Sequence, residues 1–131
     1  MKILIIDDEV AAQTRLVALL KPFGDCDTAS DGPEAILKIQ QSYLEYDFYD
    51  LMAIDINIPS ISGLDLLTKI YHDENMLNMP ISKKLVVSSE GTPGNVKAAA
   101  ERNCDGFLVK PVSKDILYKH LSRLGLYNKK A

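Results

Sequence analysis

The chain has 131 residues and a net charge of −3, from 15 basic and 18 acidic side chains. Apolar residues make up 47% of the chain and charged residues 25%, so the composition excludes a disordered or fibrous protein. Because there is no excess of positive charge to pair with a phosphate backbone, we do not expect nucleic-acid binding. The length suits a single domain.

The chain begins with a short apolar segment that acidic residues end. The run Lys2–Ile6 favours a buried strand, and Asp7, Asp8 and Glu9 follow it directly. The run is far too short for the core of a signal peptide or for a membrane span. We therefore expect a cytoplasmic protein that does not associate with a membrane.

Four later segments are also predicted to be strands. They are short runs of apolar or β-favouring residues, and the first of them has the weakest pattern. These segments are Cys26–Ala29, Leu51–Ile54, Leu85–Val87 and Phe107–Val109.

Helical patterns lie between these strands. Apolar residues recur on one face of Val10–Leu20 and of Glu34–Ile39, which predicts two amphipathic helices. Ser62, Thr92 and Ser113 each have the side chain of a helix N-cap, which predicts three more helices.

The helix after Ser62 is predicted to end at about Tyr71. The stretch His72–Lys84 is polar, contains Pro80 and has weak periodicity, so we interpret it as a long connection.

Strands that alternate with helices indicate βαβ units with right-handed crossovers. The predicted fold is therefore an α/β doubly wound parallel sheet of five strands, flanked by five helices on both faces. In such sheets the functional crevice lies outside the carboxyl ends of the strands.

Residues with reactive or charged side chains follow four of the five predicted strands. Asp7 and Asp8 follow the first strand and Asp55 follows the third, so three carboxylates converge and require a cation. Hard oxygen ligands in a partly open site suit Mg²⁺. Ser88 and Lys110 end the fourth and fifth strands and add a hydroxyl and a positive charge, which suggests phosphoryl chemistry.

Each of these residues also has an ordinary structural explanation. Asp7 and Asp8 suit the acidic first turn of a helix. Asp55 could cap a loop, Ser88 could be a small residue that ends a strand, and Lys110 could be an ordinary solvated lysine. Their joint placement at one edge of the sheet favours a phosphorylation site. A carboxylate can be the nucleophile of phosphoryl transfer and form an aspartyl phosphate.

Four motifs in order, together with Gly63, resemble those of the receiver domains of two-component response regulators. The resemblance extends from Lys2 to about Arg123 and implies a flavodoxin-like sheet with strand order 2-1-3-4-5. It also implies one receiver domain over residues 1–124 and a short tail over 125–131, with no effector domain. The motifs are Ile5–Glu9, Ile54–Pro59, Val86–Ser89 and Phe107–Pro111.

The resemblance implies a role for each residue of the site. Asp55 is the phosphoacceptor, and Lys110 pairs with the phosphoryl oxygens. Asp8, Asp55 and the backbone carbonyl of Asn57 are direct ligands of Mg²⁺, for which Mn²⁺ can substitute. Asp7 acts through a metal-bound water.

It further implies a switch next to the acceptor. Ser88 moves toward the phosphoryl group and Phe107 changes position with it, while Asn57 and Glu90 influence how fast the phosphoryl group is hydrolysed. Phe107 replaces the tyrosine of many relatives and so lacks a hydroxyl for a partner to bind. The Lys110–Pro111 peptide bond is expected to be cis.

The expected function is phosphorelay signalling rather than catalysis on other molecules. A sensor histidine kinase or a histidine phosphotransfer protein donates the phosphoryl group, and an unidentified protein reads the switch. The chain is expected to be a monomer or a phosphorylation-dependent dimer. Two alternatives remain: a Mg²⁺-dependent phosphatase or phosphotransferase with an aspartyl-phosphate intermediate, and a pseudo-receiver that signals without phosphate. Asp55-Ile56-Asn57 departs from the DxD pattern of such enzymes.

Overall fold

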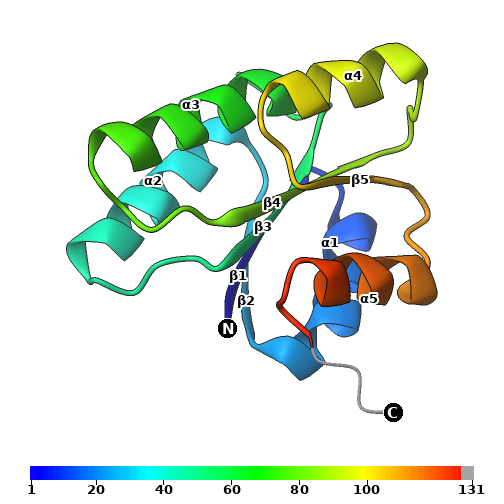
Figure 1. Ribbon diagram of the computed structural model, residues 1–131, viewed down its shortest axis with the longest axis horizontal. Helices are drawn as coiled ribbons and strands as arrows, with labels where there is room; N and C mark the ends of the chain where they lie inside the picture. Colours follow the sequence, from blue (N-terminus) through cyan, green and yellow to red (C-terminus); the bar gives the residue numbers. More distant parts are fainter. Residues whose placement is uncertain (128–131) are drawn as a thin grey trace.

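The computed structural model describes residues 1–127, which form one parallel sheet between two layers of helices (Figure 1). The strand order is β2-β1-β3-β4-β5, which confirms the predicted fold class. The strands are β1 (Lys2–Ile6), β2 (Asp25–Ala29), β3 (Leu51–Asp55), β4 (Lys83–Ser88) and β5 (Gly106–Val109). The helices are α1 (Val10–Leu20), α2 (Gly32–Leu44), α3 (Gly63–Met76), α4 (Pro93–Glu101) and α5 (Lys114–Arg123), with a 3-10 turn over Lys21–Phe23.

Residues 128–131 of the predicted tail lie outside the described residues. Within residues 1–127, no helix has both the length and the apolar character needed to cross a membrane.

The two faces of the sheet are both covered. Helices α1 and α5 lie on one face, and α2, α3 and α4 lie on the other (Figure 1). In β1, Ile3 and Ile5 pack into the core under α1 and α5, whereas Leu4 and Ile6 pack into the core under α2 and α3. Because successive side chains of a strand point to opposite faces, a strand covered on both faces must be apolar throughout. This explains the uninterrupted apolar run near the N-terminus.

Strand β2 is an edge strand, and its sequence reflects that position. It pairs with β1 alone, and its Asp25 and Asp27 are exposed while Ala29 is buried. Two of its five residues are therefore exposed to solvent, so its apolar pattern is weak.

The end of α3 and the start of β4 differ from the prediction. The helix continues to Met76 and β4 begins at Lys83, so the interpretation of His72–Lys84 as one long connection is wrong. The helix continues because Glu74 occupies the buried face after Ile70, and its carboxylate pairs with Lys84 in the interior. A buried carboxylate interrupts the apolar periodicity from which helices are predicted.

The three predicted N-caps are confirmed. The side chains of Ser62, Thr92 and Ser113 accept hydrogen bonds from backbone N–H groups in the first turns of α3, α4 and α5. Asp31 caps α2 in the same way, so that helix begins at Gly32, ahead of the predicted Glu34.

Candidate functional site

The carboxyl edge of the sheet carries the residues that the sequence singles out. Asp7 follows β1, Asp55 ends β3, Ser88 ends β4 and Lys110 follows β5. Because β1, β3, β4 and β5 are consecutive neighbours in a parallel sheet, their carboxyl ends share one rim.

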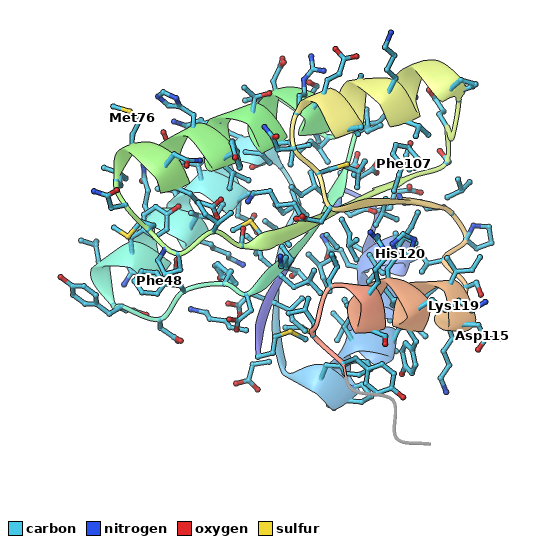
Figure 2. The ribbon with its side chains drawn as sticks, in the orientation of Figure 1. Phe48, Met76, Phe107, Asp115, Lys119 and His120 are labelled. Carbon is cyan, nitrogen blue, oxygen red and sulfur yellow. The ribbon has the colours of Figure 1, made fainter. Side chains whose placement is uncertain are left out.

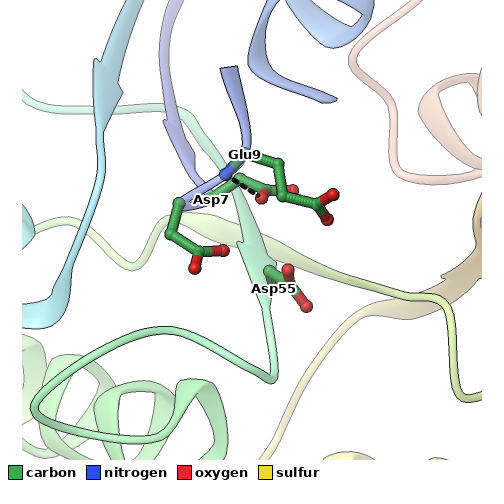
Figure 3. A group of neighbouring side chains, drawn as sticks. Asp7, Glu9 and Asp55 are labelled. Carbon is green, nitrogen blue, oxygen red and sulfur yellow. Dashed lines mark hydrogen bonds between the residues drawn. The ribbon is translucent and has the colours of Figure 1, made fainter. Parts of the chain in front are cut away.

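An acidic cluster lies at this rim. Asp7, Asp8, Glu9 and Asp55 each offer a carboxylate oxygen, and these oxygens all lie within 4.8 Å of one another. Asp7 and Asp55 are buried, with 1% and 5% of their surfaces exposed, whereas Asp8 and Glu9 are exposed. Figure 3 shows how Asp7 and Glu9, in the loop between β1 and α1, approach Asp55 at the end of β3.

Lys110 brings a positive charge into this cluster. Its Nζ atom lies 2.7 Å from Asp7 Oδ2, 3.0 Å from Asp55 Oδ2 and 3.3 Å from Glu9 Oε1. Burial lowers the pKa of Lys110, but contacts with Asp7 and Asp55 outweigh that effect and raise the pKa above its ordinary value. The lysine is therefore fully charged at neutral pH.

The environment of Asp55 shifts its pKa in two opposite directions. Burial raises its pKa, and the hydrogen bonds from Lys110 and from the Asn57 backbone lower it; the balance is a raised pKa. Desolvation thus outweighs the neighbouring ammonium, and a further positive charge at the site stabilises the ionised form.

Local turns hold the functional side chains in place. Asp7 Oδ1 accepts a hydrogen bond from Glu9 N at 2.9 Å, and Asp55 Oδ1 accepts one from Asn57 N at 3.2 Å. Ser88 Oγ accepts one from Glu90 N at 3.0 Å. Each side chain therefore orders the loop that follows it.

Gly63 makes the tight β3–α3 loop possible. Its N–H donates to the Ile56 carbonyl at 2.8 Å. A Cβ atom at this position would lie 2.0 Å from the Asp55 carbonyl oxygen, closer than real Cβ atoms approach. No other residue type fits without moving the loop that follows Asp55.

The chemistry of this donor set fits a hard divalent cation. The cluster holds four carboxylates, and the ammonium of Lys110 contacts three of them, which leaves an excess of negative charge. Carboxylate oxygens in a partly open site are the ligands that Mg²⁺ prefers.

The other predicted residues surround this cluster. Ser88 is fully buried, whereas Asn57 and Glu90 are exposed on the loops after β3 and β4. Phe107 is half-buried in β5 and packs against the core on the α4 side (Figure 2). The Lys110–Pro111 peptide bond is cis, as the resemblance implied.

Glu9 is a contact of the site that sequence reasoning did not single out. Its contact with Lys110 joins positions 101 residues apart, which no local pattern reveals. The available signal was its place directly after two acidic residues.

Comparison with known proteins shows which proteins this chain resembles. The model of the response regulator receiver domain matches residues 3–122. The chemotaxis protein CheY of Pseudomonas aeruginosa is 29% identical over 126 residues, which cover 95% of each chain. CheY-3 of Vibrio cholerae is 31% identical over 95% of this chain and 91% of its own length.

Solved structures agree with this likeness. A CheX–CheY–BeF3–Mg complex from Borrelia burgdorferi superposes with a TM-score of 0.83 at 24% identity, over 95% of this chain and 89% of that one. A CheY-like receiver domain from Methanospirillum hungatei gives a TM-score of 0.74 at 28% identity, over 95% and 93%.

Proposed function

Because this chain belongs to the family of response regulator receiver domains, we propose that it is a phosphorylation switch in which Asp55 accepts the phosphoryl group. The observation that carries the proposal is the position of Asp55: it is buried at the carboxyl end of β3, and Lys110 Nζ lies 3.0 Å from its Oδ2. Receiver domains are signalling switches, and any catalysis here concerns the chain's own phosphorylation and dephosphorylation.

The transfer is a displacement at phosphorus. A carboxylate oxygen of Asp55 forms the new P–O bond, and the bond from phosphorus to the donor's leaving group breaks, with the electron pair going to that group. The ammonium of Lys110 pairs with the phosphoryl oxygens, and the hydroxyl of Ser88 moves to donate to one of them. No proton has to be removed from the nucleophile, because Asp55 attacks as a carboxylate.

The acidic cluster holds the metal in this proposal. Asp8, Asp55 and the backbone carbonyl of Asn57 would bind the ion directly, and Asp7 would act through a water; the four clustered carboxylates support this assignment. When bound, Mg²⁺, or Mn²⁺ in its place, neutralises charge on the transferred group.

The switch converts phosphorylation of Asp55 into a conformational change at the surface. We assign this role to Ser88 and Phe107, and we assign control of the phosphoryl lifetime to the exposed side chains of Asn57 and Glu90. Phe107 has no hydroxyl, so a partner reads its position through apolar contact.

The partners follow from phosphorelay signalling. The donor is a sensor histidine kinase or a histidine phosphotransfer protein in the cytoplasm, and the output is contact with a downstream protein. Two of the relatives are named chemotaxis proteins, and the Borrelia protein was solved with CheX, which supports output through protein contacts. The chain acts as a monomer or as a phosphorylation-dependent dimer.

Phosphorylation by a small phosphodonor tests the proposal. Incubation with acetyl phosphate and Mg²⁺ should add one phosphoryl group, measured by intact mass, and EDTA should prevent it. Asp55→Asn should abolish the gain, whereas Asp115→Asn on α5 should leave it unchanged. Labelling of Asp55→Asn would show that the acceptor is another residue.

Two further measurements separate the alternatives. Multiple turnovers on a phosphate monoester would favour a phosphatase. If beryllofluoride with Mg²⁺ causes no change in the NMR spectrum of the backbone amides, a phosphate-independent binding module is favoured instead.

A further inference from the structure

Lys110 has a third carboxylate partner besides the two it shares with the proposed metal site. Its Nζ atom contacts Asp7 and Asp55, and it also lies 3.3 Å from Glu9 Oε1. In the proposed site Asp55 would bind the metal ion directly and Asp7 would act through a water. Glu9 belongs to the same cluster, but the resemblance to receiver domains implies no ligand role for it.

The side chain of Glu9 is available for this contact. Glu9 is the N-cap residue of α1, but its side chain makes no capping hydrogen bond. Its backbone is extended, and its N–H donates to Asp7 Oδ1 at 2.9 Å. With 67% of its side chain exposed, Glu9 costs little desolvation on binding an ammonium. The backbone is thus fixed to Asp7 while the carboxylate reaches Lys110.

A divalent cation and the Lys110 ammonium compete for the same oxygens. An ion bound by Asp55, with Asp7 acting through a water, would weaken two of the three contacts of Lys110, because two cations close together repel each other. The contact between Lys110 and Glu9 would remain. We infer that Glu9 is a positioning residue: its ion pair with Lys110 holds the ammonium at the edge of the site while the metal binds, and this reduces the repulsion between the ammonium and the ion.

This inference rests on the proposed function, and its test measures metal affinity directly. The Kd for MgCl2 is obtained by NMR titration of the backbone amides in the unphosphorylated chain. Glu9→Gln keeps the size of the side chain and removes its charge, and we expect it to weaken Mg²⁺ binding by about two- to fivefold, the range for an exposed ion pair. Glu101→Gln, which makes the same change of net charge on α4, should not alter the Kd.

Two variants separate positioning of Lys110 from a direct effect of charge on the ion. Glu9→Asp keeps the charge but draws the carboxylate back by one methylene, so we expect it to weaken Mg²⁺ binding as Glu9→Gln does. In a Lys110→Met background, Glu9→Gln should change the Kd by less than half of its effect in the original chain. Equal factors in both backgrounds, or an unchanged Kd in Glu9→Asp, would overturn the inference.

The outcome also separates this inference from the proposed function. If the original chain shows no Mg²⁺-dependent shifts, the proposed metal site is wrong and the role of Glu9 falls with it. If the original chain binds Mg²⁺ and Glu9→Gln binds it equally well, only the role of Glu9 is wrong.

Discussion

Gly63 and Asp55 lie so close that a Cβ atom on Gly63 would stand 2.0 Å from the Asp55 carbonyl oxygen and 2.7 Å from its carbonyl carbon. Gly63→Ala must therefore push the β3–α3 loop away from the acceptor. We expect the free energy of unfolding to fall by about 1–3 kcal/mol, as in other overpacked sites. Urea denaturation measures this loss, and labelling by acetyl phosphate should slow in parallel.

Gly94→Ala is the matched control. A Cβ atom at Gly94 would meet only Thr92 Oγ1, at 4.0 Å, in the first turn of α4. Since an alanine restricts the unfolded chain, we expect unchanged or slightly higher stability, by up to about 1 kcal/mol. Equal stability of the two variants would contradict the close approach at Gly63.

The hydroxyl of Tyr43 in α2 is buried without a hydrogen-bond partner. Burial, together with the charges of Glu74 and Asp73, raises the pKa of Tyr43 to about 12. An unfolded tyrosine ionises near pH 10. Because the unfolded chain loses this proton first, the free energy of unfolding should decline as the pH rises from about 10 towards 12.

Tyr43→Phe should reduce that alkaline loss of stability. It also removes an unsatisfied polar group, so we expect equal or higher stability at neutral pH, by about 1 kcal/mol. Tyr49→Phe is the contrasting variant, because the Tyr49 hydroxyl donates to Asp27 Oδ2 at 2.7 Å. That variant should lose about 1–3 kcal/mol, and a similar loss in Tyr43→Phe would mean that its hydroxyl has a partner.

Glu74 and Lys84 form an ion pair in the protein interior, with 1% of each residue exposed and 2.5 Å between Oε1 and Nζ. Ser82 completes the network: its N–H and hydroxyl donate to Glu74 Oε2, and its carbonyl accepts from Lys84. Lys84→Met leaves the carboxylate buried and unpaired, so we expect it to cost about 3–5 kcal/mol in chemical denaturation.

The double variant Glu74→Leu/Lys84→Met should recover most of that loss, because neither charge remains buried. Lys69→Met is the matched control, since Lys69 pairs with Asp73 on the exposed side of the same helix. It should change stability by about 0.5 kcal/mol or less. A cost for Lys84→Met no larger than this would mean that water reaches the interior pair.

Most of the sheet was predictable because its strands are covered on both faces. The runs at Ile3–Ile6, Leu51–Ile54 and Leu85–Val87 are apolar for that reason, and each lies within an observed strand. Strand β2 was harder to predict, because Asp25 and Asp27, which are exposed at the edge of the sheet, weaken its apolar pattern.

Polar contacts within the interior were not predictable. Glu74 and Lys84 lie on a helix face and a strand that usually carry apolar side chains, so the pattern indicated a connection where α3 continues. At the site, Asp7, Asp8, Asp55 and Lys110 come together because the ends of parallel strands meet. The role of Glu9 depends on a side-chain direction, which spacing along the chain does not specify.

The ion pairs of Lys110 join the segment after β5 to residues 55 and 101 positions earlier in the chain. Contacts so distant in sequence form late, because the chain must close a long loop before they gain any energy. A chain still emerging from the ribosome, or one cut before Lys110, contains Asp55 but lacks its counter-ion. We therefore expect the chain to become able to accept a phosphoryl group only after the segment that follows β5 has joined the sheet.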